Sequence, residues 1–200
     1  MNRKGLRRKG VLLLTLVLCM LWVLPVPAAA ASFPDVDETS EYADAADFLS
    51  RMQIMIGDEK GNFNPNKTVT RAEMAAIVCR ACSVTDELKK SAEFSDVPLW
   101  HWANSYVGKA AEMGIVNGYG GGRFGPSDNV TYEQAVTMLV RSGGLSDEAV
   151  RAGGYPDGFL SVAEKKGFLK GVQAAKGEPL SRADIAMILY NGADLLVTIE

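Results

Sequence analysis

Apolar residues recur at helical spacing in three stretches, and each stretch follows a serine or threonine. The first begins at residues 69–73 (VTRAE), and weaker copies begin at residues 130–134 (VTYEQ) and 180–184 (LSRAD). In a capping box, the hydroxyl accepts a backbone N–H of the first helical turn, and the side chain three positions later bonds back. The pattern therefore predicts three capped helix starts, formed by Thr70 with Glu73, Thr131 with Gln134, and Ser181 with Asp184.

An arginine stands at the first helical position of two copies, as Arg71 and Arg182. A cation there opposes the helix dipole at a cost of about 0.3–1 kcal/mol, whereas free N–H groups and the dipole favour a bound anion. We predict that both arginines bind an anionic group; the alternative is a solvated or ion-paired surface position. On the first interpretation, Arg71→Ala weakens binding and barely changes melting, because Thr70 and Glu73 still cap the helix.

The chain repeats itself at an offset of 61 residues, which pairs residues 33–36 (FPDV) with 94–97 (FSDV). A third, shorter copy has lost the aromatic-x-Pro element of its loop. In the second copy, a helical pattern ends at Gly114, the glycine-rich residues 118–126 predict a loop with Phe124 in the local core, and a second helix follows. One such unit buries little surface, so we expect three helix–loop–helix copies to share a core.

We place the copies at residues 32–83, 93–144 and 154–196, the last being degenerate. Residues 83–93 and 142–154 are polar or glycine-rich and are predicted to be linkers. The recurring Asp35, Asp96 and Asp157 are interpreted as turn or cap residues before a helix.

Residues 1–31 have the features of a secretory signal peptide. Basic residues precede an apolar run at 11–24, and alanines follow at 28–31, so we expect cleavage near Ala30 or Ala31. The apolar run is shorter than the roughly 20 residues that cross a bilayer. The alternative is an uncleaved anchor.

Charge and motif content disfavour several functions. Without residues 1–31 the chain has 16 basic and 24 acidic residues, which disfavours a nucleic-acid partner. His101 is the only histidine and has no nucleophile motif for a catalytic pair. Cys79 and Cys82 lack a second ligand pair for zinc, so we expect reduced packing cysteines, with a local disulfide as the alternative. We predict no enzyme activity, metal or cofactor.

These features together resemble the S-layer homology family. The resemblance rests on Phe-x-Asp-Val, then Trp102-Ala103, then the segment 114–119, then Phe124-x-Pro126 and the box at 70–73. It implies an all-α fold of three helix–loop–helix repeats in a pseudo-threefold arrangement, with the first helices in a central bundle and the second projecting outward. It also implies an exported protein at the cell wall of a Gram-positive-type bacterium, which binds anionic secondary cell-wall polysaccharide, often with pyruvylated amino sugars.

The resemblance implies that the box arginine contacts the glycan in a groove between repeats. Tyr132 replaces this arginine in the second repeat, so its groove is predicted to stack on sugar without gripping a carboxylate, and one or two grooves are expected to work. The alternative is an envelope scaffold that binds another envelope protein and no glycan. The predicted glycan-binding residues are Thr70, Arg71, Gly57, Trp102, Gly118, Tyr119, Tyr132, Ser181 and Arg182.

Overall fold

The computed structural model describes residues 33–85 and 91–196. The predicted signal peptide lies outside the described residues. These described residues belong to one compact unit. In the described ranges the regular elements are α-helices with isolated β-bridges, which confirms the all-α class. The helices are α2 (Ala43–Arg51), α3 (Arg71–Ala81), α4 (Asn104–Glu112), α5 (Tyr132–Ser142), α6 (Ser146–Arg151), α7 (Asp157–Lys165), α8 (Arg182–Asn191) and α9 (Ala193–Leu196).

Each predicted repeat contains two helices joined by a loop: α2 and α3, α4 and α5, α7 and α8. The predicted loop at 118–126 is non-helical, and Phe124 is fully buried as expected. None of the helices in the described ranges is both long and apolar enough to span a bilayer.

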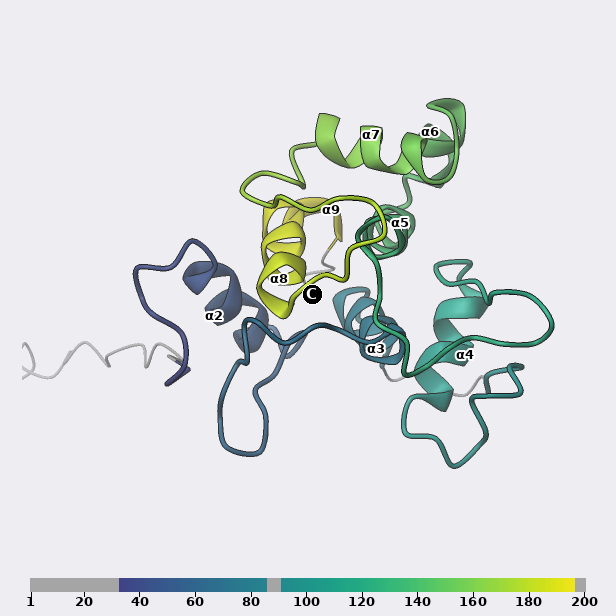
Figure 1. The fold of residues 1–200 in the computed structure, drawn as a ribbon, viewed down its shortest axis with the longest axis horizontal. Coiled ribbons are helices and arrows are strands. Elements are labelled where there is room, and N and C mark those ends of the chain that lie inside the picture. The colour runs from purple at the N-terminus through teal and green to yellow at the C-terminus, as the bar shows by residue number, and fades with distance from the viewer. Residues whose placement is uncertain (1–32, 86–90, 197–200) are drawn as a thin grey trace, which may run out of the picture. The chain divides into compact units, whose positions relative to one another are not determined.

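The second helix of each repeat, rather than the first, lies near the middle of this unit (Figure 1). α3 buries nine of its eleven residues, whereas α2 buries three of its nine. α5 packs against both α3 and α8, while α4 packs on α3, α7 on α5 and α2 on α8. The prediction that first helices form the central bundle is therefore wrong. A helix that is apolar around most of its circumference must be enclosed, and α3 has this character.

Three extended segments that precede the second helices form a closed ring of backbone hydrogen bonds. The Val69 N–H donates to Leu180 O at 3.1 Å, the Val130 N–H to Val69 O at 2.9 Å, and the Leu180 N–H to Val130 O at 3.2 Å. All three side chains are fully buried. The ring gives the three helix–loop–helix units a threefold pseudosymmetry and makes the shortened third unit a full structural partner.

Two of the three predicted capping boxes form. Thr70 with Glu73 and Ser181 with Asp184 exchange both bonds of the box. The predicted cap at Thr131 is wrong, because its side chain makes no cap hydrogen bond. The Gln134 amide oxygen instead accepts from Arg71 Nη1 at 3.1 Å. A bond to a charged donor is stronger than one to a neutral N–H, so Gln134 is diverted from the cap.

The predicted linker at 142–154 contains a helix, so its description as a plain connector is wrong. Acidic residues in the first turn of α6 favour a helix start. Ala149 is fully buried, and α6 packs against α7 and α5. Of the other linker, residues 86–90 lie outside the described ranges.

Two of the recurring aspartates accept backbone N–H groups of the loops, which corrects their interpretation as turn or cap residues. Asp96 accepts the N–H groups of Phe124 and Gly125 at 2.8 and 2.7 Å. Asp35 makes the equivalent pair of bonds in the first repeat. These partners lie far along the chain, where a local pattern does not reveal them. Asp157, in contrast, is the first residue of α7.

Cys79 and Cys82 are free thiols in this structure. Cys79 is fully buried, and burial raises its pKa to about 12. A thiol with this pKa stays protonated at neutral pH and is a poor nucleophile. The interpretation of Cys79 as a packing residue is confirmed.

We expect the fold to lose stability as the pH falls below about 4, the usual pKa of an aspartate. The Asn64 side chain and the Asn62 N–H lower the pKa of Asp58 to about 2. Burial opposes ionisation of Asp96, but N–H donors from the loop outweigh it and lower that pKa as well. A pKa that is lower in the folded state gives stability above the unfolded pKa, and this stability is lost as the pH falls through the folded value.

The melting temperature should therefore decrease between about pH 5 and about pH 2, the range in which these groups titrate. The decrease should be smaller for Asp58→Asn than for the wild type. Parallel pH profiles for the two proteins would show that Asp58 contributes nothing to acid sensitivity.

Candidate ligand-binding site

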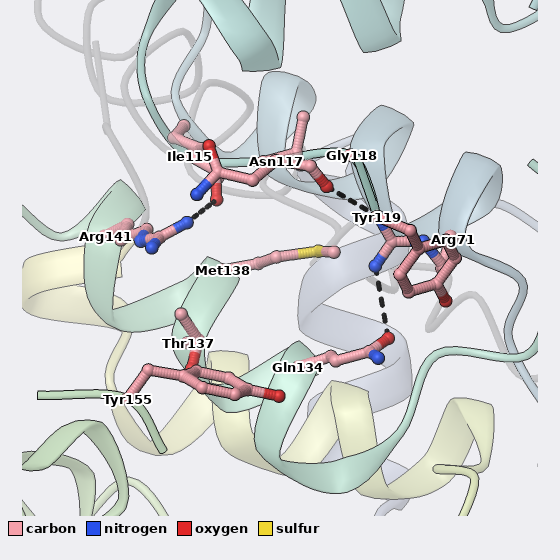
Figure 2. Close-up of a pocket in the computed structure, with 11 residues that line it drawn as sticks. Arg71, Ile115, Asn117, Gly118, Tyr119, Gln134, Thr137, Met138, Arg141 and Tyr155 are labelled. Carbon is pink, nitrogen blue, oxygen red and sulfur yellow. Dashed lines mark hydrogen bonds between the residues drawn. The ribbon is translucent and has the colours of Figure 1, made fainter. Parts of the chain in front are cut away.

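A cavity of about 390 Å³ lies where residues of all three repeats meet. Arg71 comes from the start of α3, residues 115–119 from the loop of the second repeat, and Tyr155 from the segment before α7 (Figure 2). Its volume falls within the range of about 300–1,000 Å³ that is usual for small-molecule sites. The wall from α5 consists of Gln134, Thr137, Met138 and Arg141.

Arg71 is a buried cation at one end of this cavity, with only 3% of its surface exposed. Its Nε donates to Phe124 O at 2.9 Å, and its Nη2 to Asn117 O at 2.8 Å. The third bond, from Nη1, is the one to Gln134 at 3.1 Å. The guanidinium lies 4.4 Å from the centre of the Tyr119 ring and 4.6 Å from that of Phe124. Every one of these partners is neutral.

The positive charge of Arg71 is thus held without a close counter-ion. No ion pair found within residues 33–85 and 91–196 includes this side chain. Burial lowers the pKa of Arg71, against an opposing effect of Tyr119 and Asp128, yet an arginine stays protonated in proteins. A buried charge that lacks a counter-ion is costly, so the cavity favours an anion.

The backbone at the start of α3 does not contribute to this preference. The Arg71 N–H donates to Asp128 O at 2.9 Å and the Ala72 N–H to Pro126 O at 3.1 Å. The Arg182 N–H at the start of α8 is likewise used, by Lys67 O at 2.9 Å. The argument that free N–H groups attract an anion is therefore wrong, because a neighbouring repeat supplies carbonyl acceptors. The attraction comes from the guanidinium itself.

Arg141 is a second cation of the cavity, which the sequence reasoning missed. It lies opposite Arg71, with the Met138 side chain between them (Figure 2). Its Nη1 donates to Ile115 O at 3.2 Å. The available signal was the recurrence of a basic residue at this position in the first repeat, Arg80.

Thr137 is a further residue that the sequence reasoning missed. It is buried, and its hydroxyl oxygen has no hydrogen-bond partner among the described residues. Since Thr137 lines the cavity, this hydroxyl can bond to a polar ligand. Its position four residues before Arg141 puts both on one face of α5.

The structure brings only some of the predicted glycan-binding residues to this cavity. Arg71, Gly118 and Tyr119 line it. A Cβ at Gly118 would lie 2.5 Å from Arg123 O, so packing requires glycine there. The hydroxyls of Thr70 and Ser181 are used in their capping boxes.

The other predicted residues lie elsewhere. Trp102 is 58% exposed and stacks on His101, with ring centres 5.9 Å apart. Arg182 lies near Gly57, because its Nη2 donates to Ile56 O at 3.0 Å. Tyr132 begins α5 and packs against the edge of the core.

Two segments of this chain match a known protein family. Residues 32–75 and 93–136 each match the S-layer homology domain. The two S-layer homology segments end inside α3 and α5, so the match covers the outer helix, the loop and the helix start of the first two units.

Three bacterial surface proteins are among the relatives of this chain. It is 33% identical over 166 residues to a cell surface protein of Thermoanaerobacter kivui, an alignment that covers 81% of this chain and 21% of the relative. It is 30% identical over 181 residues to a surface-layer 125 kDa protein of Lysinibacillus sphaericus (83% and 15%). It is 31% identical over 179 residues to a middle cell wall protein of Brevibacillus brevis (86% and 16%). The aligned part thus spans about a fifth or less of each relative.

Proposed function

We propose that this chain is a non-enzymatic module that anchors a protein at the surface of a Gram-positive-type bacterium by binding an acidic cell-wall polysaccharide. The S-layer homology match and the surface proteins among its relatives support surface anchoring. The observation that carries the choice of ligand is the buried, uncompensated Arg71 in a cavity with a second arginine.

The geometry of Arg71 suits a carboxylate, such as that of a pyruvylated amino sugar. Its bonds to protein use the Nε proton and one proton on each Nη nitrogen. Each Nη therefore keeps a second N–H, which can donate to a carboxylate oxygen. Tyr119 and Tyr155 are 50% and 56% exposed, so their rings are accessible to a sugar face.

The same proposal treats residues 154–196 as a third, degenerate S-layer homology repeat. Leu180 completes the backbone ring and Ser181 forms a capping box. Arg182 also repeats two bonds of Arg71: Nε donates to Phe63 O at 2.7 Å and Nη2 to Ile56 O at 3.0 Å.

A second candidate is an envelope scaffold that binds another protein. It is favoured by a short exposed apolar segment, in which Leu99, Trp100 and Trp102 are 79%, 85% and 58% exposed. Exposed apolar groups that lie together often mark a protein-binding surface.

Arg141→Gln is expected to weaken wall binding by about 10- to 100-fold, the scale of a lost hydrogen bond to a charged group. The fold should persist, because Arg141 is only half-buried. Its Nη1 donates to Ile115 O at 3.2 Å, and its guanidinium lies 5.4 Å from the centre of the Phe159 ring. The measurement is co-sedimentation with purified cell walls, before and after removal of their acidic polymer.

Arg151→Gln is the matched control, because it makes the same charge change at an exposed position of α6. It should bind like the wild type. Equal binding by Arg141→Gln, together with undiminished binding to stripped walls, would contradict the proposal. Loss of wall binding in Trp100→Ala alone would favour the scaffold.

A further inference from the structure

The pseudosymmetry places a second arginine in the same backbone setting as Arg71. Arg182 bonds to the carbonyls of Phe63 and Ile56, which correspond to those of Phe124 and Asn117 around Arg71. Its guanidinium also lies over a phenylalanine ring, 4.9 Å from the centre of Phe63. The backbone acceptors and the aromatic ring are thus equivalent for the two arginines, so any difference in ligand preference must come from the remaining neighbours.

Those neighbours differ in charge. The offset of 61 residues pairs Gln134 with Glu73 and Tyr119 with Asp58. Gln134 gives Arg71 a neutral amide acceptor. Burial lowers the pKa of Arg182, and the acids Glu73 and, more weakly, Asp58 oppose that effect. Acids thus replace the amide and the phenol near Arg182, although the Glu73 carboxylate itself accepts from Thr70 and Lys67.

The third groove has no arginine in the equivalent place. Tyr132 replaces it, Asp184 takes the position of Gln134, and Asn191 takes that of Arg141. A cavity of about 440 Å³ beside α8 is lined by two acids, Glu41 and Asp44, against one cation, Lys170. Asn191 lines this cavity, but Tyr132 and Asp184 do not, and its excess of acids disfavours an anionic ligand.

From these differences we infer that one groove of the three, the one that contains Arg71, binds the acidic ligand, and that the neutral amide of Gln134 sets this selectivity. The inference rests on the proposed function and adds to it the number of sites and the residue that determines them. A carboxylate at position 134 would occupy the N–H groups of Arg71 and repel a second anion at close range.

The test is Gln134→Glu, titrated by calorimetry with a 4,6-pyruvylated N-acetylhexosamine and, separately, with the same sugar without its pyruvyl group. The wild type should bind the acidic sugar with one site per chain and show little affinity for the neutral one. Gln134→Glu should lower the affinity at least about tenfold, because like charges juxtaposed in a binding site are strongly unfavourable.

The variant is expected to fold, since a glutamate occupies the equivalent position 73 at the start of α3. Thermal melting of the same samples checks this. Gln173→Glu is the matched control: it makes the same charge change at an exposed position in the loop of the third unit and should leave binding unchanged.

The outcomes separate the two proposals. Wild-type affinity in Gln134→Glu, or two or three sites per chain, overturns the inference and leaves the proposed function in place. Absence of binding by the wild type, to the acidic sugar and to cell walls alike, overturns both.

Discussion

Arg71→Ala is expected to lower the free energy of unfolding by about 2–5 kcal/mol, because an acceptor left without its donor in a buried position costs about 1–3 kcal/mol. The change leaves the carbonyls of Phe124 and Asn117 without their donor, and both are bonds of 2.9 Å or less. It also removes the cation that lies against the Tyr119 ring. Denaturant unfolding followed by circular dichroism measures the effect.

Arg71→Lys is the companion variant, because it keeps the positive charge but loses the planar guanidinium with its fixed N–H donors. It should recover only part of the lost stability. Arg182→Ala should cost less than Arg71→Ala, since Arg182 is only half-buried. A loss below about 1 kcal/mol for Arg71→Ala, the net value of a single ordinary hydrogen bond, would show that its contacts contribute little to the fold.

A chain of residues 32–144, which contains both segments that match the S-layer homology domain, is expected not to unfold cooperatively. It lacks α8, against which α2 packs, and α7, which packs on α5. It also lacks four fully buried aliphatic side chains, Leu180, Ile185, Ile188 and Leu189. At about 1.5–3 kcal/mol for each buried side chain, their loss is comparable to the roughly 5–15 kcal/mol that stabilises a typical domain.

Thermal melting and the dispersion of amide proton signals would be measured beside a chain of residues 32–196. The longer chain should give a sigmoidal transition and the shorter one a broad, shallow slope. A sigmoidal transition of the shorter chain at the same midpoint would show that the first two repeats are an independent domain.

Local features of the fold were predictable because they depend on neighbours in sequence. The boxes at Thr70 and Ser181, the loop at 118–126 and the burial of Phe124 were all correctly predicted. The same local rule failed at Thr131, because the amide that should complete its box bonds to a side chain 63 positions away. The local sequence shows that Gln134 is able to complete a capping box. It does not show that a distant arginine competes for the same amide oxygen.

The site was only partly predictable for the same reason. Arg71 was identified from its unfavourable position in a first turn, but its three partners lie 46 to 63 residues away in sequence. The expectation that its removal would spare stability came from treating it as a surface cation, whereas it is 3% exposed. The choice of central helices was equally non-local, because each outer helix packs on the second helix of another repeat.

The ring through Val69, Val130 and Leu180 also limits the number of helix–loop–helix units that can join it to three. Each of the three residues donates its N–H to one member of the ring and accepts with its C=O from the other, so no group remains for a further member. Open repeat arrays grow by stacking one more unit at an end. In this closed ring no terminal unit has a free backbone group to which another unit could bond. Duplication of a single unit would therefore leave that unit unpaired there, and the fold is expected to multiply only in whole triplets.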